Sequence, residues 1–134
     1  MKLLDEYLND LIELQSVNYQ TYEENKLIRR AVERTLHLAL ESCLDIGQHI
    51  IAREGFRTPE DNKDVFVVLS EAGIIPTEML PNFIAMARFR TLIVHDYARV
   101  DNTIVFGILK RHLTDFNVFT EGVLNYLQAG SKNL

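Results

Sequence analysis

The chain has 134 residues, of which 47% are hydrophobic, with a formal net charge of -5 and one cysteine. This length and composition indicate one globular domain over residues 1–134 with a full core, and exclude a disordered chain. The acidic charge argues against a general nucleic-acid coat protein, and a single cysteine excludes an internal disulfide.

The sequence also carries no sign of export. The first twenty residues contain four acidic side chains and no basic stretch followed by an apolar one, so we expect no signal peptide. The longest apolar run, residues 65–69, is too short to span a membrane. The lone Cys43 suits a reducing compartment, so a cytoplasmic protein is expected.

The first half of the chain has a helical period. Residues 2–18 form the first predicted helix, with leucines and an isoleucine at helical spacing. A capping box of Thr21 and Glu24 predicts the start of a second helix of about 30 residues, which ends at Gly55 and could kink at Gly47.

Thr58 and Pro59 predict the start of a third helix, and Gly73 its end. Residues 65–68 could alternatively form a strand, but no second strand is available to pair with it, so we favour a helix.

A fourth helix is expected to start between Thr77 and Pro81, and a fifth at Asp101 or Asn102. The fifth has a clean apolar stripe: Val105, Leu109, Leu113, Phe116, Phe119, Val123 and Leu127. Short connections favour antiparallel neighbours. The sequence therefore predicts an all-α fold, an antiparallel up-and-down bundle of about five helices.

The fourth helix combines an apolar surface with unexpected charges. Residues 84–112 carry five basic and two acidic side chains, so this segment is +3 while the remainder is -8. The imbalance is either chance scatter or an electropositive site for a phosphate group on an acidic body. Arginine is rarely buried without a partner, and histidine titrates near neutral pH.

The positions of these charges depend on the helix being continuous. If residues 82–99 form one helix, one stripe carries Arg88, Thr91, His95 and Arg99, and another carries Arg90 and Tyr97. Arg90 and His95 are then offset by about 140° around the axis. They can serve one site only if the arginine wraps around, if the helix breaks near Asp96, or if a second copy of the chain supplies one of them.

Three of these residues form a recognisable pattern: Arg90, four residues, His95, one residue and Tyr97, placed before a last amphipathic helix. Together with the segments LALESCLDIGQHIIAREGFRTP and HDYARVD, this pattern resembles the HEPN superfamily and, within it, the HepT-like branch. The resemblance implies a HEPN-like fold and a homodimeric, metal-independent endoribonuclease without cofactors. It implies the toxin of a type VII-like toxin–antitoxin pair, silenced by a minimal nucleotidyltransferase antitoxin that attaches AMP to the motif tyrosine, here Tyr97.

The chemistry of RNA cleavage suits the motif. Attack by the 2′-OH needs a proton removed from that hydroxyl, a proton given to the leaving 5′ oxygen, and positive charge beside the phosphorane. His95 can do the first two and Arg90 the third. The two proton transfers would be easiest with one histidine as the base and another as the acid. One chain has a single motif histidine, and a two-fold dimer supplies the second.

Four further residues are candidates for supporting the site or binding RNA: Arg88, Thr91, Asp96 and Arg99. Two of them depart from the family pattern, which commonly has asparagine where this chain has Thr91 and a small residue where it has Arg88. We expect these departures to affect rate or substrate preference rather than the fold. The alternative function, from a different class, is a noncatalytic module that docks to a nucleotidyltransferase.

The remaining histidines carry weaker signals. His37 with Glu33 or Glu41, and His49 with Asp45, could begin a metal site, but no third ligand is evident on a nearby segment. We interpret both groups as solvated helix faces and predict no metal site. His112 is expected to be structural.

Overall fold

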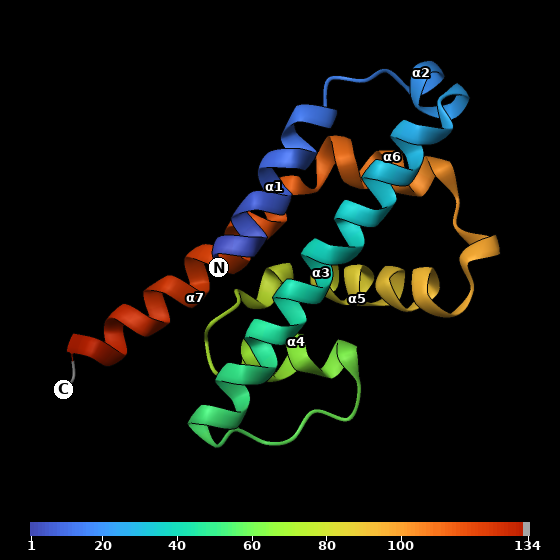
Figure 1. The fold of residues 1–134 in the computed structure, drawn as a ribbon. Helices are drawn as coiled ribbons and strands as arrows, with labels where there is room; N and C mark the ends of the chain where they lie inside the picture. Colours follow the sequence, from blue (N-terminus) through green and yellow to red (C-terminus); the bar gives the residue numbers. More distant parts are fainter. Residues whose placement is uncertain (133–134) are drawn as a thin grey trace.

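The computed structural model describes residues 1–132, apart from the side chains of Tyr97, Ser131 and Lys132. Over these residues the chain forms seven α-helices, two single-turn 3-10 helices and no strand (Figure 1). The α-helices are α1 (Lys2–Leu14), α2 (Tyr19–Glu24), α3 (Lys26–Glu54), α4 (Asn62–Glu71), α5 (Leu80–His95), α6 (Asn102–Arg111) and α7 (Leu113–Lys132). The predicted all-α fold is confirmed, but with seven helices instead of about five.

The first difference lies near residue 20, where two asparagines cap two separate helices. The Asn18 side chain accepts a hydrogen bond from the Thr21 N–H at 2.8 Å and starts α2, and Asn25 accepts one from the Ile28 N–H at 3.0 Å and starts α3. The predicted capping box at Thr21 is therefore wrong, because asparagine is a strong N-cap and Thr21 lies inside α2.

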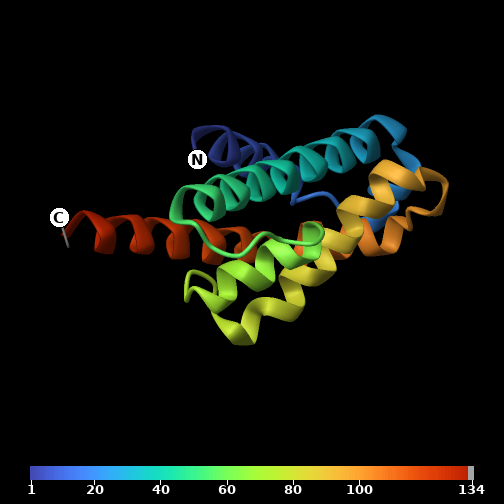
Figure 2. The same cartoon turned by 90° about the horizontal axis from the view of Figure 1, so that it is seen from below.

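Helix α3 is the central element. Figure 2 shows α1 on one side of α3 and the α4–α5 pair on the other, and α3 packs against all three. It runs through Gly47 as one continuous helix and ends, as predicted, at Gly55 in the left-handed conformation, with φ of 70°. A Cβ atom at Gly47 would lie 2.9 Å from Val65 Cγ1, so this glycine allows α4 to approach α3 closely.

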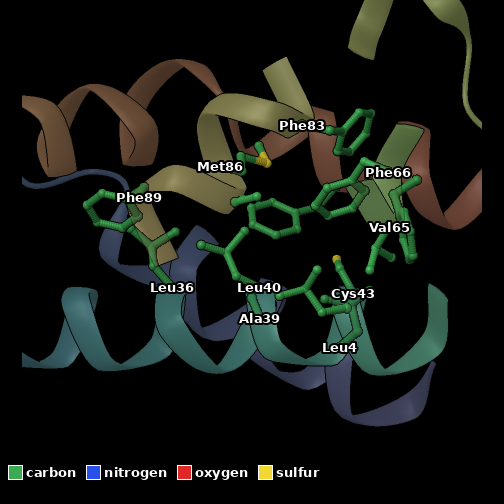
Figure 3. Packing of buried hydrophobic residues seen from close by; sticks show 14 of the residues in the cluster. Leu4, Leu36, Ala39, Leu40, Cys43, Val65, Phe66, Phe83, Met86 and Phe89 are labelled. Atoms are coloured by element: carbon green, nitrogen blue, oxygen red, sulfur yellow. The ribbon is translucent and has the colours of Figure 1, made fainter. Parts of the chain in front are cut away.

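The buried core includes side chains from all seven α-helices, and one part of it lies between α3 and the α4–α5 pair. Figure 3 shows Leu36, Leu40 and Cys43 of α3 directed toward the aromatic and sulfur-containing side chains of α5 and α4, with Phe89 above Leu36. Residues 65–68, which could have formed a strand, are helical in α4. Helix α4 starts at Asn62, later than predicted, because Asp61 is the residue whose side chain caps it.

The last predicted helix is divided into α6 and α7 at His112. Its imidazole Nδ1 lies 3.0 Å from Oδ2 of the buried Asp115, which also accepts a hydrogen bond from the Asn82 amide at 3.2 Å. The predicted apolar stripe is buried across both helices up to Val123, and Leu127 is partly exposed. His112 therefore has a structural role at the junction, as expected.

No helix within residues 1–132 has both the length and the apolar character that crossing a membrane requires.

Candidate active site

Helix α5 ends inside the motif. It runs through His95, and Asp96 leaves the helical region with φ of -150° and ψ of 58° while its N–H still bonds to the Leu92 carbonyl at 2.8 Å. The next three residues, Tyr97–Arg99, form a 3-10 turn. Of the three arrangements considered from sequence, the helix break near Asp96 is therefore present. The continuous helix over residues 82–99 does not form, so Arg99 does not continue the stripe of His95.

Arg90 is fixed against the neighbouring helix. Its Nε donates to Oε1 of Glu41 in α3 at 2.5 Å, and its side chain is only 21% exposed. A guanidinium has five N–H donors, and this contact uses one of them. Arg90 is thus oriented by α3, and its other four donors have no hydrogen-bond partner among the described residues.

Glu41 is shared between Arg90 and a histidine. His37 Nε2 lies 3.2 Å from the same Oε1, and His37 Nδ1 lies 3.3 Å from Nη1 of Arg34. Because a guanidinium only donates, Nδ1 is the acceptor in this contact and Nε2 donates to Glu41. Arg34, His37, Glu41 and Arg90 form one hydrogen-bonded line across the α3–α5 contact, which we call the seam line.

The pKa of Glu41 reflects these contacts. Partial burial raises it, but the hydrogen bonds and charge from Arg90 and the hydrogen bond from His37 outweigh the burial and bring the pKa below the ordinary value of 4.5. Glu41 is therefore a carboxylate at neutral pH, the form that attracts Arg90.

Sequence reasoning missed Glu41 as a partner of Arg90. The interpretation of His37 and Glu41 as a solvated helix face is wrong, because both are partly buried and directed toward α5. The sequence did contain a signal for this arrangement. His37 and Glu41 are four residues apart, and each follows a buried leucine, Leu36 or Leu40, so both side chains lie near the buried side of the helix. His49 and Asp45 are exposed, as expected, and no cluster within the described residues could hold a metal ion.

His95 has a different environment from Arg90. It is the last residue of α5, it is exposed, and its side chain has no hydrogen bond or ion pair within the described part of the chain. The Arg90 guanidinium is directed toward α3, and the two positions are about 140° apart around the helix. Within the described residues of one protomer, no hydrogen bond joins the two motif side chains.

The supporting candidates fall into two groups. Arg88 and Thr91 line a hollow of about 330 Å³ together with Lys63 at the start of α4, and the Thr91 hydroxyl donates to the Ala87 carbonyl at 3.1 Å. Past the end of α5, Arg99 Nε lies 3.0 Å from Oδ2 of Asp96, and the two side chains are 80% and 44% exposed.

The Tyr97 side chain lies outside the described residues, so its predicted role in modification stays a prediction. Its backbone belongs to the 3-10 turn that follows the break in α5.

Residues 1–132 therefore form an all-helical domain that carries the Arg-x4-His-x-Tyr pattern across the end of α5. The family described as "Ribonuclease HepT-like" matches residues 4–123. The chain therefore belongs to the HepT-like ribonuclease family, as the sequence resemblance predicted.

Individual relatives agree with this assignment. The chain is 27% identical over 100 residues to the mRNA nuclease HepT of Shewanella oneidensis, covering 75% of each protein. It is 22% identical over 127 residues to the tRNA nuclease HepT of Aphanizomenon flos-aquae, covering 95% of this chain and 86% of that relative.

A solved structure shows the same fold. The tri-AMPylated Shewanella oneidensis HEPN toxin, in complex with its MNT antitoxin, matches this chain with a TM-score of 0.84 at 22% identity, covering 92% of each chain.

Proposed function

We propose that this chain is a metal-independent endoribonuclease toxin of a toxin–antitoxin pair, and that Arg90 and His95 carry out the cleavage. The observation that carries the proposal is the arrangement on α5, where Glu41 orients Arg90 and the exposed His95 ends the same helix. Membership of the HepT-like family and the nuclease names of two relatives support RNA as the substrate.

In the proposed reaction, His95 takes the proton of the 2′-OH, whose oxygen then bonds to the adjacent phosphorus. The bond from phosphorus to the 5′ oxygen breaks, and that oxygen receives a proton from a second imidazolium. The products are a cyclic 2′,3′-phosphate and a free 5′-OH. The remaining N–H donors of Arg90 bind the phosphoryl oxygens, whose negative charge grows in the transition state.

The second imidazole is proposed to come from a second copy of the chain. A two-fold dimer with both copies of His95 near the axis would provide separate acid and base groups. Val94, beside His95, and Ile104, near the start of α6, are 44% and 52% exposed, which supports an apolar contact close to the motif. Sedimentation is expected to give a dimer at micromolar concentration, and a monomer would contradict this arrangement.

The proposed partner is a minimal nucleotidyltransferase antitoxin that moves AMP from ATP to the Tyr97 phenol oxygen and releases pyrophosphate. The solved relative is itself AMPylated and bound to an MNT antitoxin, which supports this partner. An added phosphate could pair with Arg90 or Arg99 and compete with the RNA backbone. After coexpression, the intact mass should rise by whole AMP units, and should not rise in Tyr97→Phe.

The activity is tested by incubating the purified chain with RNA in excess chelator. We expect cleavage to persist, because His95 and Arg90 provide the proton transfers and the charge. No cleavage in any buffer, together with retained binding to the nucleotidyltransferase, would favour the noncatalytic interaction module instead.

A further inference from the structure

A second hollow opens between α3 and α5, beside the seam line. It has a volume of about 300 Å³ and is lined by Arg30, Glu33, Arg34, His37 and Ile93. His37 connects it to the proposed catalytic arginine, because His37 and Arg90 share the Glu41 carboxylate. The hollow therefore lies beside the hydrogen-bonded line that ends at Arg90.

The accessible charge of this hollow is positive. Arg30 and Arg34 are both exposed and lie one turn apart on α3, which separates them by about 6 Å along the axis. Within the described residues, neither has a carboxylate within ion-pair distance, and the polar contact of the Arg34 side chain is with the ring of His37. Glu33 also lines the hollow but is only 7% exposed, so the two arginines present most of the exposed charged surface.

Arg30 and Arg34 therefore present two exposed guanidinium groups to one hollow, on a chain with 19 acidic residues and 14 basic ones. Arginine has a planar set of donors that matches phosphate oxygens, and contacts of this kind fix the position of a nucleic-acid strand without reading its bases. Arg90, at the other end of the seam line, is the side chain proposed to bind the reacting phosphate.

We propose that Arg30 and Arg34 bind a backbone phosphate of the RNA strand that neighbours the phosphate being cleaved. This inference rests on the proposed function, because it takes Arg90 as the reference point of the strand. The subsite sets where the strand lies relative to Arg90, and it contributes affinity that is independent of base sequence.

The test measures binding separately from cleavage, in the His95→Ala background. Binding of fluorescein-labelled single-stranded RNA is followed by anisotropy at several salt concentrations. For single strands, log K falls with log salt by about 0.7 per phosphate contact. The variant Arg30→Gln/Arg34→Gln should therefore bind more weakly, with a slope reduced by about 0.7. The control Lys2→Gln/Arg53→Gln removes the same charge from exposed positions outside the hollow and should keep the slope.

Each outcome decides between the two proposals. Equal slopes for the Arg30/Arg34 variant and the control, or no RNA binding at all, would overturn the phosphate subsite, even if the unmodified chain cleaves RNA. A reduced slope in the Arg30/Arg34 variant alone, combined with an unmodified chain that never cleaves RNA, would support the subsite and overturn the nuclease. Thermal unfolding followed by circular dichroism confirms that all variants are folded.

Discussion

Arg90 and His95 lie five residues apart on one helix, yet their surroundings differ sharply. The Arg90 side chain is 21% exposed and bonded to Glu41 of α3, whereas the His95 side chain is exposed and has no hydrogen bond or ion pair among the described residues. The comparison suggests that the charge-stabilising half of the proposed site is formed within one protomer. The proton-transfer half remains open to substrate or to a second copy of the chain.

The difference follows from the packing of α5. Next to Arg90, the buried Phe89 lies above Leu36 of α3 (Figure 3), and Met86 is also buried, so the helix is held by the core on this side. Past His95 the helix ends, and Asp96 departs from helical geometry. Side chains at the end of a helix have fewer neighbours and therefore more freedom to meet a ligand.

The largest effect on cleavage is expected at the proton-transfer half of the proposed site, which contains His95. His95→Ala should lower the cleavage rate by about 10²–10⁴, the usual contribution of one acid–base group. The helical circular dichroism should be unchanged, because the side chain is exposed. The matched control is His49→Ala, an exposed histidine on α3, which should keep full activity. Full activity in His95→Ala would remove the catalytic assignment.

At the charge-stabilising half of the proposed site, Arg90→Ala should lower the cleavage rate by about 10²–10³, as expected for the loss of one preorganised charge-stabilising group. It should also lower thermal stability, because Glu41 would keep a partly buried charge without its main partner. Arg90→Lys keeps the charge but loses the fork of donors, so its rate should be intermediate. Arg53→Ala serves as the control, and a rate for Arg90→Ala equal to that of this control would be inconsistent with the proposal.

Glu41→Gln tests whether orientation of Arg90 matters. Misplacement of a catalytic group by about 1 Å can cost roughly 10²-fold, so we expect a loss of roughly tenfold or more, in kcat rather than in KM. A loss confined to KM would indicate that Glu41 does not act through Arg90.

The stability of Glu41→Gln should also depend on pH differently from that of the unmodified chain. The pKa of Glu41 in the folded chain lies below 4.5, so its contribution is complete above pH 4.5 and is lost as pH falls through the folded value. Urea unfolding should therefore lose stability in acid less steeply for Glu41→Gln than for the unmodified chain. Identical pH dependence would show that the pair with Arg90 adds no stability.

The smallest effect is expected at Asp64, which pairs with Arg57 rather than with Arg90 or His95. Arg57 binds the Asp64 carboxylate through both Nη atoms, at 2.7 and 2.8 Å, and the hydrogen bonds from Arg57 lower the pKa of Asp64 to about 2. This contribution to stability is complete above pH 3.8 and is lost as pH falls through about 2. Asp64→Asn should slightly lower the urea midpoint at neutral pH and leave RNA cleavage unchanged, and a strong effect on cleavage would show that α4 shapes the site.

Several parts of the fold could be predicted from local sequence. The start of α5 and the end of α3 at Gly55 follow from backbone preferences of single residues, and both were placed correctly. The division near His112 was missed, because an unbroken apolar stripe fits one long helix as well as two packed ones. The separate α2 was missed because Asn18 and Asn25 cap more effectively than Thr21.

The sequence by itself determined the helical class, the family and the positions of Arg90, His95 and Tyr97, because periodicity and motif spacing are properties of neighbouring residues. Only the tertiary structure decided that Arg90 pairs with Glu41, 49 positions earlier in the chain, and that the two arginines of α3 lie beside the same seam. The physical reason is that these contacts depend on how α3 and α5 pack. No local pattern specifies which faces of two distant helices will meet.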